Sequence, residues 1–176
     1  MKYKTIVIDP PWDVNICVGK QCKGSPNALP YKTMTDDQIY NFNIHKFADE
    51  ECNLFLWTIK SKIHTSFHIL TMWGFRYTNL IVWNKRSGIN NNGFCNTLEY
   101  MLHGYMGKNN LDFTTPLPTY FMAKRRKHSQ KPDLFYSMLR ERTLEPRIDI
   151  FARKRHYGFD AWGDQVETHE QKPLLS

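Results

Sequence analysis

The chain has 176 residues, 41% of them hydrophobic and 14% aromatic, and a formal net charge of +7. This length and composition predict one folded domain and exclude a disordered chain, which lacks the apolar groups that offset the entropy of ordering. No stretch approaches the ~20 apolar residues of a membrane span, and the positive charge is compatible both with binding a polyanion such as nucleic acid and with simple solubility.

The first half of the chain alternates expected strands and helices. Three β-branched residues in a row, Ile6 to Ile8, predict a strand that is covered on both faces. A loop rich in Gly, Lys, Asn and Pro follows over 13–30. Thr35 stands three residues before Gln38, the spacing of a capping box, so we expect a short helix to begin there. The next elements expected are a strand over 53–58, a helix over 60–74 that ends at glycine, and a strand over 76–85.

The second half continues with a polar, Asn-rich segment over 86–97, which we expect to form a loop. Two amphipathic strands, over 98–107 and 118–123, are expected at an edge of the sheet, where antiparallel pairing is an open option. Pro132 opens a helix with an apolar face of Leu134, Phe135, Met138 and Leu139. A last strand is expected over 147–153. Alternation of strands and helices predicts an α/β fold.

Four cysteines stand at positions 17, 22, 52 and 95. They form no CxxC pair and have no histidine at zinc-finger spacing. We therefore expect reduced thiols, which are typical of a cytosolic protein, and no metal site.

The sequence "DPPW" places a carboxylate and two prolines directly after the first strand. The prolines fix φ and lack an N–H, so the backbone at Pro10 and Pro11 can only accept hydrogen bonds. A carboxylate beside such carbonyls suits a ligand group with two hydrogens to donate, an amine. Two acceptors on the exocyclic amine of adenine would orient it and make its nitrogen more nucleophilic. Asp9 and Pro10 are therefore candidate amine-binding residues.

Trp12, the last residue of this motif, is a candidate surface on which an extruded base stacks. The four residues alone leave another explanation open. A strand can simply end at Pro-Pro, with Asp9 on the surface and Trp12 in the core. The rest of the chain has to decide between the two.

Six segments decide it by resemblance: "DPPW" at 9–12, "YKTM" at 31–34, "LFLWT", "LIVWNK", "HSQKPD" and "IFARKRHYGFDAWGDQ". In this order and at these intervals the chain resembles the adenine methyltransferase family of the eukaryotic mRNA 6-methyladenosine writer and its microbial and viral relatives. The likeness covers residues 3–167. It implies a Rossmann-like methyltransferase sheet in circularly permuted order, with the catalytic motif first and the cofactor-binding part last. We expect a single methyltransferase domain over 1–167 and a flexible tail over 168–176.

The resemblance also assigns site residues. The catalytic motif corresponds to Asp9, Pro10, Pro11 and Trp12. The substrate pocket corresponds to Tyr31, Trp83 and Glu99. Contacts with S-adenosylmethionine correspond to Asp9, Lys131, Arg153, His156, Asp164 and Gln165.

Three of these assignments depend on further reasoning. Asp164 stands where the family has asparagine, and an aspartate can still accept from both ribose hydroxyls. Trp83 lies within a strand pattern, which leaves a place in the core equally open. Lys131, near the start of a helix, suits the carboxylate of the cofactor.

The resemblance implies transfer of a methyl group from S-adenosylmethionine to the 6-amino group of adenine in nucleic acid. The chain is close to the bare catalytic core, so we expect DNA rather than RNA and a microbial or viral protein of the cytoplasm. The alternatives are an RNA adenine methyltransferase, a catalytically silent partner subunit that binds nucleic acid, and a methyltransferase for a free nucleotide or a protein amide. A homodimer or a related partner subunit is a further expectation.

Overall fold

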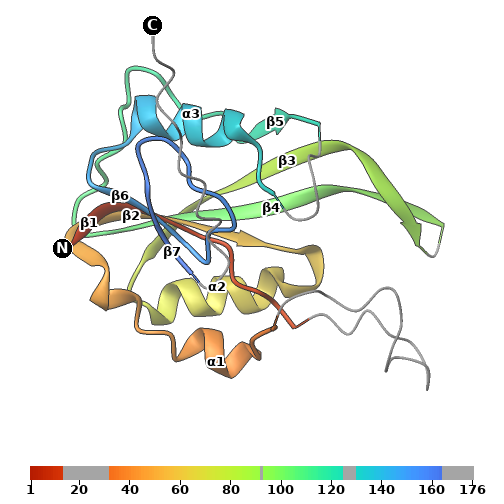
Figure 1. Ribbon diagram of the computed structural model, residues 1–176, viewed down its shortest axis with the longest axis horizontal. Helices are drawn as coiled ribbons and strands as arrows, with labels where there is room; N and C mark the ends of the chain where they lie inside the picture. Colours follow the sequence, from red (N-terminus) through yellow and green to blue (C-terminus); the bar gives the residue numbers. More distant parts are fainter. Residues whose placement is uncertain (14–31, 92, 125–129, 164–176) are drawn as a thin grey trace, which may run out of the picture.

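In the computed structural model, the described residues, 1–13, 32–91, 93–124 and 130–163, build one mixed sheet with helices on both faces (Figure 1). The strands follow the order β5-β3-β4-β2-β1-β6-β7. The strands are β1 (Tyr3–Ile8), β2 (Ala48–Thr58), β3 (Arg76–Asn91), β4 (Phe94–Met106), β5 (Tyr120–Met122), β6 (Arg147–Ile150) and β7 (Asp160–Trp162). The sheet and its helices confirm the Rossmann-like α/β class, whereas the permuted order stays a prediction. The expected tail over 168–176 lies outside the described residues, as does the predicted loop over 13–30 apart from Asp13.

The apolar run of β1 forms the centre of the sheet. Its residues alternate between two hydrophobic clusters, because successive side chains of a strand point to opposite faces. Ile6 and Ile8 join the cluster under α1 (Asp36–Tyr40) and α2 (Ile63–Met72). Val7 joins the cluster under α3 (Asp133–Arg142), which covers the other face (Figure 1). The sheet is therefore a middle layer between two helical layers.

The parallel pairing of β1 determines where a site can form. β1 pairs in parallel with both β2 and β6, so the carboxyl ends of these three strands lie at one edge of the sheet. Asp9 follows β1 directly, and Arg153 follows β6 after a short turn. Ligands of open α/β sheets bind beyond the carboxyl ends of the strands. The fold thus brings together residues that are far apart in the sequence.

The segment 86–97, expected as a loop, is instead part of a long hairpin, so that prediction was wrong. β3 and β4 pair antiparallel out to Asn91 and Phe94, with a register shift between Asn84 and Ile89. The hairpin extends beyond the helices at one end of the molecule (Figure 1). A two-stranded ribbon with solvent on both faces needs no apolar alternation, so polar residues there do not exclude strand pairing.

Several other predicted elements are confirmed, with corrections at the edge of the sheet and in α3. The capping box of Thr35 and Gln38 is present. β4 is antiparallel to both of its neighbours, but it lies inside the sheet between β3 and β2, and β5 forms the edge. The buried face of α3 consists of Phe135, Tyr136 and Leu139, while Leu134 is 47% exposed. Within the part of the chain that the structure describes, no helix is long and apolar enough to cross a membrane.

Candidate active site

Asp9 lies in a network of charged side chains at the edge where β1 and β6 end. The Nζ atom of Lys131 lies 3.2 Å from Oδ1 of Asp9 and 2.9 Å from Oε2 of Glu99. The same ammonium lies over the ring of Trp57, 4.7 Å from the ring centroid. Lys131 therefore bridges two carboxylates and contacts an aromatic face. All three charged side chains are largely buried, with 12% of Lys131, 18% of Asp9 and 22% of Glu99 exposed.

The hairpin contributes the other half of this network. Glu99 lies on β4 and forms a second ion pair, with Lys85 of β3, whose Nζ lies 3.3 Å from Oε1 of Glu99. Asp9, Lys131, Glu99 and Lys85 thus form a chain of alternating charge from the end of β1 to the base of the hairpin. Alternation of this kind lowers the cost of burying each charge, because each has an opposite charge beside it.

The network affects the protonation of both carboxyls. Burial raises the pKa of Asp9 and the Glu99 charge adds to this, while Lys131 and Arg153 act in the opposite direction without reversing it. Burial also tends to raise the pKa of Glu99, but Lys131 and Lys85 together lower it below its usual value. Glu99 is therefore the partner that ionises more readily, and Asp9 is a stronger proton acceptor than an ordinary aspartate.

The two prolines make the backbone acceptors expected of them, although both carbonyls already accept one hydrogen bond. The Trp12 N–H donates to the Pro10 carbonyl at 2.8 Å, and the Met34 N–H donates to the Pro11 carbonyl at 2.8 Å. A carbonyl oxygen has two lone pairs, so each retains a position for a ligand hydrogen. Pro10 is itself buried, so the pairing of its carbonyl with Asp9 on a ligand amine stays a prediction.

Trp12 does not provide the stacking surface that the sequence suggested. Only 6% of the residue is exposed, and its Nε1 donates to the carbonyl of Trp57 at 3.2 Å. A buried ring bonded in this way has no open face for a base. Trp12 instead anchors the end of the motif to the neighbouring strand β2.

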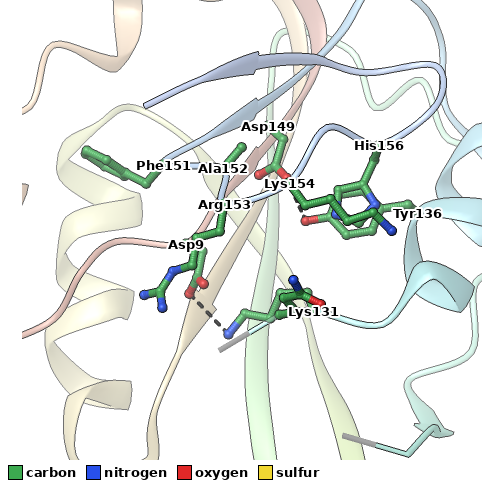
Figure 2. Close-up of a pocket in the computed structure, with 10 residues that line it drawn as sticks. Asp9, Lys131, Tyr136, Asp149, Phe151, Ala152, Arg153, Lys154 and His156 are labelled. Atoms are coloured by element: carbon green, nitrogen blue, oxygen red, sulfur yellow. Dashed lines mark hydrogen bonds and ion pairs between the residues drawn. The ribbon is translucent and has the colours of Figure 1, made fainter. Parts of the chain in front are cut away.

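Two cavities lie beside Asp9. The larger one, of about 800 Å³, is bounded by the end of β1, the segment before α1, the end of α1 and the turn after β6. Its polar lining residues are Asp9, Lys32, Thr33, Gln38, Asn41, Asn43 and Arg153. The smaller one, of about 20 Å³, contains Lys131, Tyr136 and Asp149 in its lining (Figure 2). Both cavities share Asp9 and Arg153, so they are neighbours at the end of β1.

The sequence of the chain matches a known protein family. The family model MT-A70 matches residues 3–165. The chain belongs to the MT-A70 family. The matched span contains every residue of the charged network and both cavities' linings, so the family likeness covers the whole site.

Individual relatives are 26% to 29% identical to this chain over the aligned spans. The N(6)-adenosine-methyltransferase MT-A70-like protein of Arabidopsis thaliana is 27% identical over an alignment of 177 positions, gaps included, that covers 93% of this chain and 24% of that protein. The N(6)-adenosine-methyltransferase catalytic subunit METTL3 of Homo sapiens is 29% identical over 164 residues, 86% of this chain and 26% of that protein. The Type II methyltransferase M.MunI of Mycoplasma sp is 26% identical over an alignment of 195 positions, gaps included, that covers 96% of this chain and 80% of that protein. The chain thus spans about a quarter of the plant and human proteins but most of M.MunI.

The remaining site residues expected from sequence divide into three groups. His156 reaches the smaller cavity, where its ring stacks on Tyr136 with centroids 3.4 Å apart. Trp83 lies in the core beneath α3, 2% exposed, with its Nε1 donating to the Ala123 carbonyl, and it is absent from the linings of both cavities. Its place in a substrate pocket stays a prediction. Tyr31, Asp164 and Gln165 lie outside the described residues.

Sequence reasoning missed one acidic residue of the site, Asp149. It is 3% exposed and lies within β6, where its Oδ2 accepts from the hydroxyl of Tyr136 at 2.7 Å. A signal was present, because an aspartate inside the apolar strand "RIDIF" breaks the pattern of a buried strand. Lys85 was missed because a lysine at the end of an expected strand is usually solvated.

The donor set fits S-adenosylmethionine. A volume of about 800 Å³ is within the usual range of roughly 300–1,000 Å³ for small-molecule sites. Carboxyls suited to an ammonium, Asp9 and Asp149, lie beside cations suited to a carboxylate, Lys131 and Arg153. Among the described residues no group of three or more His, Cys, Asp or Glu side chains could hold a metal ion.

Proposed function

We propose that the chain transfers a methyl group from S-adenosylmethionine to the 6-amino group of adenine in nucleic acid, with DNA as the favoured substrate. The observation that supports this most is Asp9, a buried carboxyl with a raised pKa, at the border of a cavity of about 800 Å³ and directly before the two prolines, which have no backbone N–H. The names of the relatives support the same chemistry, since two of those compared are N(6)-adenosine-methyltransferases.

The acceptor pair accounts for the chemistry of the amine. S-adenosylmethionine, when bound, supplies a methyl group already activated by its sulfonium. Asp9 and the Pro10 carbonyl accept the two amine hydrogens and direct the nitrogen lone pair at the methyl carbon. As the C–N bond forms and the S–C bond breaks, the nitrogen must lose one proton. Asp9, with its raised pKa, is placed to accept that proton.

Three basic side chains support binding of the methyl donor. Lys131 and Arg153 line the smaller cavity together with His156. Lys131 is already paired with Asp9 and Glu99, so its positive charge is fixed in place before any ligand arrives. A positive charge fixed in this way stabilises a bound anion more than a mobile surface lysine does, because no side chain has to reorganise on binding.

The hairpin of β3 and β4 is the natural contact for nucleic acid. A two-stranded β-ribbon fits the major groove of duplex DNA, where the adenine 6-amino group is exposed. Arg86 is an exposed residue of the ribbon. Lys60 contacts the ribbon, because its Nζ donates a hydrogen bond to Oδ1 of Asn96 at 3.0 Å. Because the base of the ribbon carries Lys85 and Glu99, a duplex held there lies next to the Asp9 network. The alignment with M.MunI, which covers 80% of that protein, favours DNA further.

Replacing Lys60 and Arg86 by alanine should weaken binding of nucleic acid about equally for all sequences. Removal of one phosphate contact should reduce the slope of log affinity against log salt by about 0.9. Lys46 provides a matched control. Lys60 follows the carboxyl end of β2, whereas the exposed Lys46 precedes the amino end of that strand, roughly 30 Å away. Fluorescence anisotropy with labelled DNA over a salt series measures both effects. An equal loss with Lys46→Ala would contradict the placement of DNA on the hairpin.

The substrate is tested by supplying S-adenosylmethionine with a labelled methyl group together with single-stranded DNA, duplex DNA or RNA of one sequence. We expect the most label in DNA. RNA is the second candidate, because METTL3 is named an N(6)-adenosine-methyltransferase, and preferential labelling of RNA would select it. Binding of the cofactor without transfer to any of the three would contradict the proposed activity and favour a silent partner subunit.

A further inference from the structure

Asp149 has one carboxyl oxygen that the fold leaves without a partner. Its Oδ2 accepts from Tyr136, while Oδ1 is buried and has no hydrogen-bond partner in the described part of the chain. A buried polar atom in this condition costs free energy unless something binds it. Asp149 lines the smaller cavity beside Asp9, so a ligand group there can reach it (Figure 2).

The size of this cavity limits what it can hold. Its volume of about 20 Å³ is close to the roughly 10–15 Å³ that one water-sized group requires. The body of a cofactor therefore belongs in the larger cavity, and only one small polar group extends toward Asp149. Asp9 and Arg153 line both cavities and mark where they meet.

The charges around Asp149 favour a cationic group. Asp9 and Asp149 interact unfavourably when both are ionised, and a cation between them would remove this repulsion. A carboxylate bound in the same place would instead be repelled by both Asp9 and Asp149. The charged and titratable groups around Asp149 are Tyr136 and Asp133 of α3, Asp9 after β1, Lys131 before α3, and Arg153, Lys154 and His156 after β6. The ammonium of Lys131 pairs with Asp9 and Glu99, so these two carboxylates already balance its charge.

We propose that Asp149 is a second acceptor for the ammonium group at the amino-acid end of the methyl donor, and that it releases its proton to solvent when this group binds. The inference rests on the proposed function, because it takes S-adenosylmethionine as the ligand. The ammonium has three N–H donors, enough for Oδ1 of Asp149 and the carboxyl of Asp9 together.

Proton release follows from the environment of Asp149. The pKa of Asp149 is raised to about 8, mainly by burial and further by Asp9, while the Tyr136 hydroxyl and Lys131 act in the opposite direction. Below that value the protein without ligand holds the acid mainly in its neutral form. A bound ammonium favours the ionised form, so binding and loss of the proton are linked. Affinity should therefore increase as the pH rises toward 8.

The test is calorimetric binding of S-adenosylhomocysteine, which has the same ammonium group, to the wild type and to Asp149→Asn. Measurements between about pH 6 and about pH 7 keep the ligand's own amino group, which titrates near pH 8, almost fully protonated. For the wild type we expect affinity to increase by about tenfold per pH unit, with release of close to one proton per ligand in paired buffers of different ionisation enthalpy. Asp149→Asn should bind about 10- to 100-fold more weakly at the upper pH and release no such proton.

Two controls separate this role from a structural one. 5′-Methylthioadenosine lacks the amino-acid end, so wild type and Asp149→Asn should bind it equally. Tyr136→Phe removes the hydrogen bond that lowers the pKa of Asp149, and should shift the pH dependence upward while the acid remains in place. This variant keeps the test valid should Asp149→Asn fail to fold.

The possible results differ for the two proposals. Unchanged affinity and proton release in Asp149→Asn would overturn the role of Asp149 and leave the methyltransferase assignment intact. An equal loss of affinity for 5′-methylthioadenosine would also overturn it, because the contact would then not be at the amino-acid end. No binding of either ligand by the wild type would instead overturn the proposed function itself.

Discussion

Replacing Asp9 by asparagine is expected to reduce methyl transfer by about 100- to 1,000-fold at saturating S-adenosylmethionine. The change keeps the size of the side chain but removes its negative charge, which accepts the hydrogen bonds of the amine. It also removes the group that accepts the proton lost by the nitrogen. Because the Lys131 ammonium retains Glu99 as a partner at 2.9 Å, the fold should tolerate the substitution. Single-turnover transfer to an adenine-containing oligonucleotide measures the chemical step.

Asp13 provides the matched control for this experiment. It is an exposed aspartate four positions after Asp9, beyond the Pro-Pro turn. Asp13→Asn removes the same charge from the same segment and should leave the rate within about twofold of wild type, as for most surface substitutions. A comparable loss of rate in both variants would show that the segment needs negative charge in general, and not an acceptor at position 9.

Replacing Lys131 by methionine should have the largest effect on stability, because it leaves Asp9 and Glu99 buried without their shared cation. We expect a loss of about 3 kcal/mol in the free energy of unfolding at neutral pH, the lower end of the range for breaking a buried ion pair. The deficit should shrink on acidification, since both carboxyls then become neutral. Denaturant unfolding at several pH values measures it.

The same variant should change the pH dependence of transfer. In the wild type Lys131 opposes the effect of burial and lowers the pKa of Asp9. Without it, the pKa of Asp9 rises further, so the acidic limb of the rate profile moves to higher pH and activity partly recovers in alkaline buffer. A uniform loss of rate with an unchanged profile would contradict the coupling of Lys131 to Asp9.

Lys62 separates burial from ion pairing in this comparison. Its Nζ lies 2.7 Å from Asp36, closer than Lys131 lies to Asp9, but the carboxylate of that pair is 40% exposed. A pair this accessible contributes only about 0–1 kcal/mol. Lys62→Met should therefore be nearly neutral for both stability and the pH profile. A loss of stability equal to that of Lys131→Met would show that length and charge of the side chain matter, and not its place in the network.

The sequence predicts best where local chemistry and tertiary contacts agree. The β-branched run ending at Ile8 forms the central strand, and Thr35 caps its helix, because both signals act over a few residues. Asp9 and Lys131 could be brought together from sequence only by a family resemblance. Their ion pair joins residues 122 positions apart and depends on the packing of α3, which follows Lys131, against the face of the sheet that contains Val7 of β1.

The failures have tertiary causes. A ribbon exposed on both faces has the same polar composition as a loop, so the hairpin beyond Asn84 could not be recognised. Trp12 matched a stacking role by residue type, but its orientation toward the Trp57 carbonyl follows from strand pairing. Asp149 was taken as part of a strand, and only the contact with Tyr136 of α3 shows it as part of the site.

The central claim is that Asp9 and the Pro10 carbonyl hold the 6-amino group of adenine for methyl transfer. Mass spectrometry of nucleosides, after reaction with S-adenosylmethionine carrying a deuterated methyl group, identifies the atom that is methylated. We predict label in 6-methyladenine with the wild type and almost none with Asp9→Asn. Label on cytosine or on a ring nitrogen of adenine, or 6-methyladenine formed undiminished by Asp9→Asn, would contradict the account.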